Sequence, residues 1–194
     1  MAENLMAKHS LKKLLDGNKR CVMGKLQNPR QDAKRRKEVS KGQKPFAVIV
    51  GCSDSRIPPE LIFDQGLGDL FVVRLAGNIV DTLALGSIEY AVEHLGTKLV
   101  VVLGHSKCGA VTAAANSPEA PGHVGAIVKA IQPAVKKVQK MPGDLVDNAI
   151  RANTSLVVRK IKSSKPILAE MTEKGEIEVI GAYYNIETGA VEIL

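Results

Sequence analysis

Residues 47–56 read AVIVGCSDSR, an apolar run that ends in glycine and continues directly into a thiol, a carboxyl group and a guanidinium group. The residues Val48, Ile49 and Val50 favour a strand that is buried on both faces, as in a parallel sheet. Reactive side chains follow at the carboxyl end of the strand, where open α/β sheets place their ligands. A buried strand has no structural need for a Cys-x-Asp-x-Arg continuation. The stretch therefore predicts one half of an active site.

A second apolar strand ends in the same way. Residues 99–103 read LVVVL and are followed at 104–109 by GHSKCG, which leads into an Ala-rich helix. Between the two motifs, a strand over 70–75 ends in AGN at 76–78, whose small side chains predict the close approach of a backbone or a ligand. Strands that are joined by helical crossovers predict a parallel sheet with its site along one edge. We expect an α/β fold with a central, mostly parallel sheet flanked by helices.

Composition places the chain among ordinary globular proteins. Its 194 residues are 45% apolar and 24% charged, which predicts one domain over residues 1–194. The net charge of +7 raises the question of nucleic acid, but aromatic residues make up only 3% of the chain and leave few platforms for base stacking. Solvated basic helices explain the charge better. No apolar run is long enough to span a bilayer, so we expect neither a nucleic-acid nor a membrane partner.

Helical periodicity dominates both ends of the chain. Residues 10–23 and 32–41 predict two helices within an amphipathic N-terminal arm over 1–42, which must cover either its own sheet or that of a partner subunit. The pattern from 123 to 174 is helical, with interruptions near 141–143 and 165–166. Alternation over 177–184 then predicts a strand, followed by a hairpin turn into a short final strand.

The three cysteines of the chain are Cys21, Cys52 and Cys108, and they do not form a paired disulfide framework. The first residues lack the charged-then-apolar pattern of a leader. We therefore expect a protein of a reducing compartment, the cytoplasm, where such cysteines favour metal binding or catalysis over cross-linking. Cys21 lies far upstream in an amphipathic helix and is best interpreted as a core thiol.

Cys52, His105 and Cys108 form a candidate metal site. Two thiolates and one imidazole are the kind of three-ligand set that leaves a catalytic zinc its fourth position, and no nearby Cys or His supplies a fourth ligand for a structural site. Either motif alone is more often structural than metal-binding. Their coincidence at two strand ends, beside Asp54 and Arg56, favours a site.

Asp54 and Arg56 allow three interpretations. The pair can be a plain surface ion pair in a turn. Alternatively, Arg56 holds the Asp54 carboxylate near a metal-bound water, where the carboxylate accepts a proton and orients the remaining lone pair. Asp54 can also move onto the metal and occupy its open position, which would switch the site off. The spacing of the residues is compatible with all three.

The motifs CSDSR at 52–56 and GHSKCGA at 104–110 resemble the signature pair of the β-class carbonic anhydrases, and the similarity extends from the first helix to the closing strands near 181–189. This resemblance implies one Zn²⁺ per subunit on Cys52, His105 and Cys108. It also implies reversible hydration of carbon dioxide to bicarbonate and a proton, by attack of a zinc hydroxide, with Asp54 and Arg56 as the catalytic pair. The expected assembly is a homodimer or tetramer whose N-terminal helices wrap a neighbouring subunit.

Four substrate-binding positions are implied by the same resemblance, namely Gln43, Phe71, Tyr90 and Gly109, with part of the pocket lining supplied by the partner subunit. Members that are inhibited by bicarbonate at a second site resemble one another in a Trp three residues before the first ligand. This chain keeps an arginine of that site, Arg74, but has Ile49 at the Trp position and no Trp anywhere. The resemblance therefore favours an arrangement in which Asp54 is paired with Arg56.

Two alternative functions remain open at this point. Relatives on the same scaffold hydrolyse carbonyl sulfide or carbon disulfide, which differ from carbon dioxide only in the electrophile and in pocket access. A non-catalytic zinc-binding or interaction protein that uses the basic helices is the second alternative. A purely structural metal, however, needs neither Asp54 nor Arg56.

Overall fold

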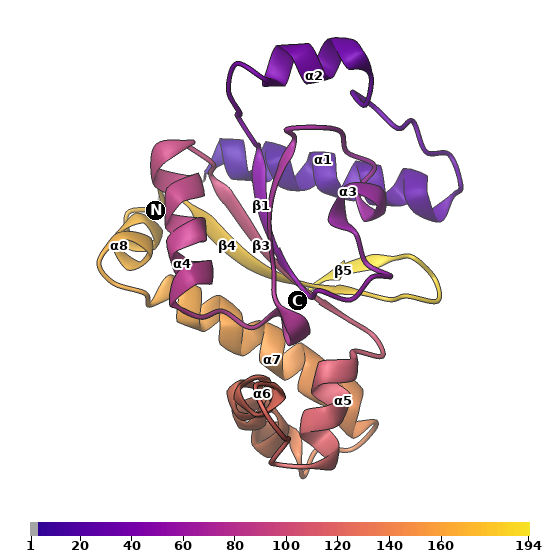
Figure 1. Ribbon diagram of the computed structural model, residues 1–194, viewed down its shortest axis with the longest axis vertical. Helices are drawn as coiled ribbons and strands as arrows, with labels where there is room; N and C mark the ends of the chain where they lie inside the picture. Colours follow the sequence, from indigo (N-terminus) through magenta and orange to yellow (C-terminus); the bar gives the residue numbers. More distant parts are fainter. Residues whose placement is uncertain (1–3) are drawn as a thin grey trace.

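The computed structural model describes residues 4–194, and its centre is a five-stranded sheet in the order β2-β1-β3-β4-β5 (Figure 1). β1 to β4 run parallel, and β5 pairs with β4 in the antiparallel direction. The strands are β1 (Ala47–Gly51), β2 (Leu70–Arg74), β3 (Leu99–His105), β4 (Glu178–Tyr184) and β5 (Val191–Ile193). The mostly parallel sheet predicted from the sequence is confirmed.

Helices connect and cover the strands. They are α1 (Leu5–Val22), α2 (Ala33–Val39), α3 (Pro59–Ile62), α4 (Thr82–Glu89), α5 (Gly109–Asn116), α6 (Val124–Val138), α7 (Leu145–Lys162) and α8 (Ile167–Glu173), with a 3₁₀ turn η1 (Ala76–Asn78) and a π-helical turn η2 (Tyr90–His94). Three of these helices follow an aspartate whose carboxylate accepts a hydrogen bond from the backbone N–H three residues later, namely Asp32, Asp81 and Asp144. Among residues 4–194, no helix has the length and apolar character needed to cross a membrane.

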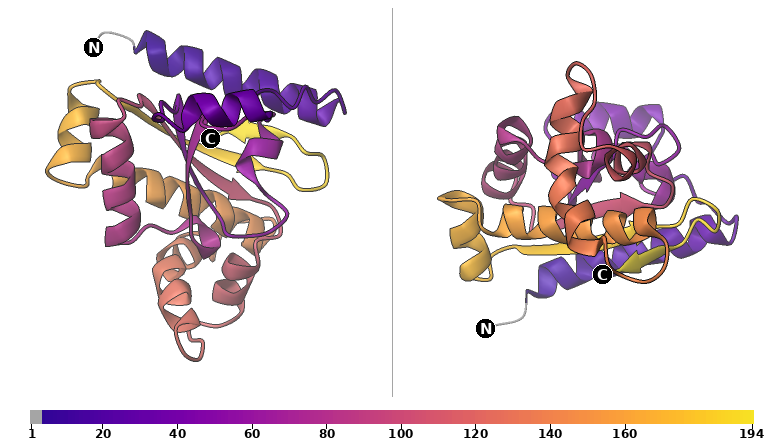
Figure 2. Two further views of the ribbon diagram at one scale, coloured as in Figure 1. Left: turned by 45° about the horizontal axis from the view of Figure 1, so that its top comes forward. Right: turned by 90° about the horizontal axis from the view of Figure 1, so that it is seen from below.

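Alternate residues of each central strand belong to different core clusters. Ile49 lies in one cluster with Leu14 of α1, whereas Val48 lies in the other with Ile88 of α4 and Leu168 of α8. The views in Figures 1 and 2 show α1 along one side of the sheet and α4 and α8 on the other. Burial on both faces explains why these strands are continuous apolar runs instead of alternating patterns.

Within the N-terminal arm, α1 packs against its own sheet, whereas α2 has no buried residue. Ala7 and Leu14 of α1 are buried in the core, while Leu5 and Met6 on the same helix are 74% and 70% exposed. The helix begins at Leu5 and not at Ser10 as predicted, because the Asn4 side chain caps its first turn by accepting a hydrogen bond from Ala7 N. Residues 1–3 of the predicted arm lie outside the described residues, and the wrapping of a neighbouring subunit stays a prediction.

Asp64, in the turn after α3, binds residues of the N-terminal arm. Its side chain is 1% exposed, lies 2.6 Å from Arg20 Nε, and accepts hydrogen bonds from the backbone N–H groups of Gln27 and Asn28. Burial raises the pKa of this carboxyl group. The bonds from Arg20 and the two N–H groups outweigh that effect, so the pKa lies below its usual value.

We expect Asp64→Asn to lower the free energy of unfolding by about 3 kcal/mol at neutral pH, because removing one partner of a buried ion pair costs about 3–5 kcal/mol. The folded pKa of Asp64 is depressed. Its contribution is therefore complete well above the unfolded pKa of about 3.9 and is lost as the pH falls through the folded value. Urea unfolding of parent and variant from neutral to acid pH measures the difference in stability and its dependence on pH. A difference between parent and variant that stayed constant at acid pH would contradict this assignment.

Candidate metal centre

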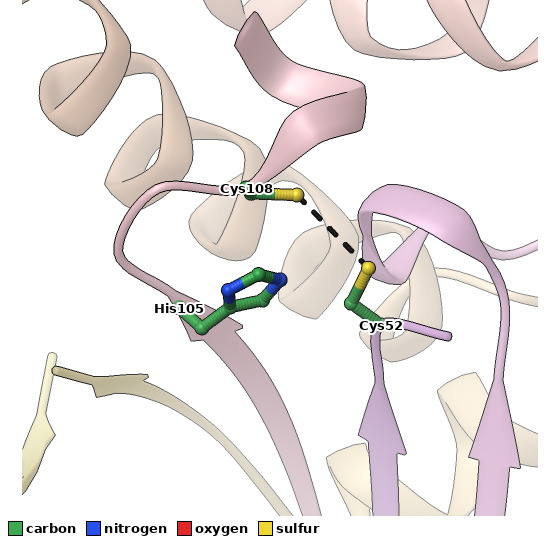
Figure 3. Close-up of side chains that lie close together, drawn as sticks. All are labelled: Cys52, His105 and Cys108. Atoms are coloured by element: carbon green, nitrogen blue, oxygen red, sulfur yellow. Dashed lines mark hydrogen bonds between the residues drawn. The ribbon is translucent and has the colours of Figure 1, made fainter. Parts of the chain in front are cut away.

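Three side chains from two strand ends meet at the carboxyl edge of the sheet. Cys52 follows the last residue of β1, His105 is the last residue of β3, and Cys108 immediately precedes α5. Their ligand atoms all lie within 4.8 Å of one another, and all three residues are buried. Figure 3 shows the two sulfur atoms facing each other beside the imidazole ring. The structure thus brings together the three predicted metal ligands.

The histidine presents one nitrogen atom to this cluster. His105 Nδ1 lies 2.9 Å from the carbonyl oxygen of Ser106. Because that oxygen can only accept, Nδ1 carries the hydrogen and Nε2 keeps its lone pair. His105 is fully buried, and Nε2 has no hydrogen-bond partner among the described residues. A buried acceptor without a partner is costly, and a bound cation would satisfy it.

The two thiols are also arranged for a cation. Their sulfur atoms are 4.0 Å apart. The contact between the two sulfur atoms lowers the pKa of the Cys52 thiol and raises that of the Cys108 thiol. Backbone N–H groups of Ala110 and Val111, at the start of α5, favour the Cys108 thiolate. Two sulfur atoms and one imidazole nitrogen fit a zinc ion with an open fourth position.

Asp54 and Arg56 form a bidentate ion pair beside the cluster of the three candidate ligands. Arg56 Nε and Nη2 lie 2.9 and 2.7 Å from the two carboxylate oxygens, and Arg56 N donates to Asp54 Oδ1 at 3.0 Å. The hydrogen bonds from the Arg56 side chain hold the pKa of Asp54 at about 2. Arg56 Nη2 also donates to Lys107 O at 3.1 Å and so joins the two sequence motifs. The sequence left open whether the Asp54 carboxylate binds the metal or Arg56. In this structure it binds the Arg56 guanidinium group.

Arg74, at the end of β2, holds the backbone that carries these groups. Its Nε and Nη2 donate to the carbonyl oxygens of Cys52 and Asp54 at 2.7 and 2.5 Å. The sequence related Arg74 only to a regulatory site. Its position at the end of a strand parallel to β1 was the signal for this contact, because the register pairs Arg74 with Gly51.

Gly77 approaches the first sulfur atom through its backbone. Its N–H donates to Cys52 Sγ at 3.1 Å. Gly77 has φ +69°, and a Cβ atom there would lie 2.6 Å from Ile131 Cδ1, so any other residue would be strained. The close approach predicted from the small residues at 76–78 is confirmed, and what approaches is the chain's own amide.

The predicted substrate-binding residues do not all gather at this cluster within one chain. Gly109 begins α5 directly after Cys108, but Gln43 is exposed before β1, at the opposite end of that strand. Phe71 pairs with Val48 early in β2, and its ring lies 6.3 Å from that of Tyr90, which is 47% exposed. Their role in binding stays a prediction.

Comparison with known proteins now identifies the family. A family model described as carbonic anhydrase matches residues 47–191. Carbonic anhydrase 2 of Mycobacterium tuberculosis is 41% identical over 182 residues, which cover 92% of this chain and 88% of that protein. The chain belongs to the carbonic anhydrase family. A carbonic anhydrase of Mycolicibacterium smegmatis is 40% identical over 186 residues and covers 94% of this chain and 90% of its own length.

Solved structures place the chain in the β class of carbonic anhydrases. A tetrameric β-carbonic anhydrase of Sordaria macrospora matches with a TM-score of 0.77 at 25% identity, covering 96% of this chain and 97% of that one. The β-carbonic anhydrase of Coccomyxa, in complex with acetazolamide, matches with a TM-score of 0.75 at 25% identity, covering 100% and 87%. With its cluster of Cys52, His105 and Cys108, this carbonic anhydrase is a zinc-dependent carbonate dehydratase with one zinc site per subunit.

Proposed function

We propose that Cys52 Sγ, His105 Nε2 and Cys108 Sγ hold the zinc ion for the reversible hydration of carbon dioxide to bicarbonate. The observation that carries this assignment is the buried His105 Nε2, which has no hydrogen-bond partner among residues 4–194, in a group whose ligand atoms lie within 4.8 Å of one another. When bound, zinc supplies a Lewis acid that lowers the pKa of a water molecule. Stopped-flow hydration of carbon dioxide by zinc-loaded protein tests the function, and a rate equal to that of buffer would overturn it.

Asp54 is the proposed catalytic residue that orients the reacting water. Its pKa of about 2 keeps the carboxylate ionised at neutral pH, so its oxygens can accept a hydrogen bond from the water and hold that proton away from the carbon atom of the substrate. Arg56 acts through Asp54 as a positioning residue. By binding both carboxylate oxygens and Lys107 O, it holds the carboxylate toward the motif that carries His105 and Cys108.

The substrate pocket is proposed to form between subunits of a homodimer or tetramer. Gly109 lies beside Cys108, whereas the exposed Gln43 and Tyr90 and the half-buried Phe71 lie elsewhere in the chain. The tetrameric relative of Sordaria macrospora supports an oligomer. A partner that supplies the two aromatic rings would enclose an apolar slot suited to carbon dioxide, with the Gln43 amide donating to a substrate oxygen. We propose a cytoplasmic enzyme in which residues 1–194 act as one domain, since α1 packs on the common core.

Mixing two variants, each expected to lose activity for a different reason, tests whether the pocket is shared. Phe71→Ala keeps the metal ligands, and Cys108→Ala keeps the aromatic rings. If Phe71 serves the partner's metal centre, a mixed dimer has one complete site, and activity should return to about half of the parent's value per mixed dimer. The measurement is carbon dioxide hydration after the two proteins are unfolded together and refolded with zinc.

Two controls accompany this experiment. Each variant refolded alone gives the baseline, and light scattering establishes the size of the assembly. Mixtures no more active than the sum of the separate variants, in an assembly shown to contain both, would place Phe71 at its own subunit's site or outside the pocket. Parallel rates on carbonyl sulfide and carbon disulfide decide between hydration and the related hydrolase activity.

A further inference from the structure

A hydrogen-bonded path leads from the middle of α7 to the first metal ligand. Asn153 Nδ2 donates to Gly77 O at 2.8 Å, and Gly77 N donates to Cys52 Sγ at 3.1 Å. Asn153 is 2% exposed and stands 76 residues away from Gly77 in the sequence. The contact therefore exists only because α7 packs beside η1 in the fold.

The path holds the peptide group that faces the sulfur atom. Gly77 is in a left-handed conformation, with φ +69° and ψ 22°, and is confined by the side chain of Ile131. Rotation of this turn would move the N–H away from Cys52 Sγ. Asn153 restrains the turn from its other side by binding the carbonyl oxygen of the same residue.

Burial of the Asn153 side chain is costly unless its amide group is hydrogen-bonded. The buried neighbours of Asn153 on α7 include Ala149, Ile150, Ala152 and Val157, so that face of the helix is mostly apolar. Burying an amide side chain is unfavourable unless its hydrogen bonds compensate for the loss of water. Here the Asn153 amide donates to the carbonyl oxygen of Gly77, the residue whose own N–H donates to Cys52 Sγ.

We propose that Asn153 is a positioning residue of the metal centre, which acts through Gly77 to direct an N–H group at Cys52 Sγ. This inference rests on the proposed ligand set. A hydrogen bond to a ligand sulfur atom fixes its direction and reduces the negative charge it presents to the metal, and partners behind the ligands tune metal affinity in this way. Removing the Asn153 donor should thus change the metal centre without removing any ligand.

Asn153→Leu, which keeps the branched shape of the side chain but is larger, and Asn153→Ala, which is smaller, both remove the donor. We expect either variant to bind zinc about 10–100-fold more weakly than the parent, measured by competition with a chromogenic chelator. We also expect a shift of the thiolate-to-cobalt charge-transfer band when cobalt(II) replaces zinc. A residue that served only stability would leave that band unchanged.

Lys160→Met is the matched control. Lys160 also lies on α7, and its Nζ donates to Val80 O at 2.6 Å, so it holds the same segment but not the peptide that faces Cys52. Parent-like zinc affinity and cobalt spectra in both Asn153 variants would overturn the inference. Changes of equal size in Lys160→Met would also overturn it, since general loosening of the segment would then suffice. Failure of the parent itself to bind one zinc would instead refute the ligand set.

Discussion

Replacement of Cys108 by alanine is expected to abolish zinc binding and carbon dioxide hydration together. The change leaves one sulfur atom and one imidazole nitrogen in a buried cluster that is built for three ligands. Removing a residue that only hydrogen-bonds to a metal ligand lowers metal affinity about 10–100-fold, and the loss of a ligand itself should exceed this. Metal content after dialysis, measured by atomic emission, and stopped-flow hydration are the two readouts.

Cys21→Ala provides the control for this experiment. Cys21 is a half-buried free thiol on α1 that takes no part in the cluster. The variant should retain one zinc per subunit and parent activity. Cys108→Ala protein that kept a full complement of zinc would refute the ligand assignment, whatever its activity.

Replacement of Asp54 by asparagine is expected to separate metal binding from turnover. The variant keeps all three ligands and should bind one zinc per subunit. A neutral amide is a weaker hydrogen-bond acceptor for the reacting water than the ionised carboxylate. The substitution also leaves the Arg56 guanidinium without its anionic partner. We expect kcat to fall about 10²–10⁴-fold, the range over which a positioned acid or base contributes to rate.

Glu187→Gln is the matched substitution for Asp54→Asn. Glu187 is an exposed acid whose Oε1 lies 2.6 Å from Lys107 Nζ, so it pairs with the residue whose carbonyl oxygen accepts a hydrogen bond from Arg56. Its loss should change kcat little, because Glu187 is not part of the ligand cluster and an exposed ion pair contributes little to the stability of the fold. Full activity of Asp54→Asn, with zinc content equal to the parent's, would remove the proposed role of Asp54.

The tertiary structure decided several features of the site that the sequence left open. The spacing of Asp54 and Arg56 was compatible with a carboxylate on the metal or on the guanidinium, and the fold has it on the guanidinium. The contact of Arg74 with Cys52 O depends on the register between β1 and β2. The start of the first helix was also predicted five residues late, since a cap at Asn4 carries no apolar periodicity.

By itself, the sequence determined the parallel sheet and the three candidate ligands. Apolar runs that end in reactive residues are local patterns, and parallel strands bring their carboxyl ends to one edge whatever the loops between them do. Only the tertiary structure decided what lies behind those ligands. The path from Asn153 through Gly77 to Cys52 joins residues far apart in the chain, and such a contact is set by the packing of α7 against η1, which no local pattern encodes.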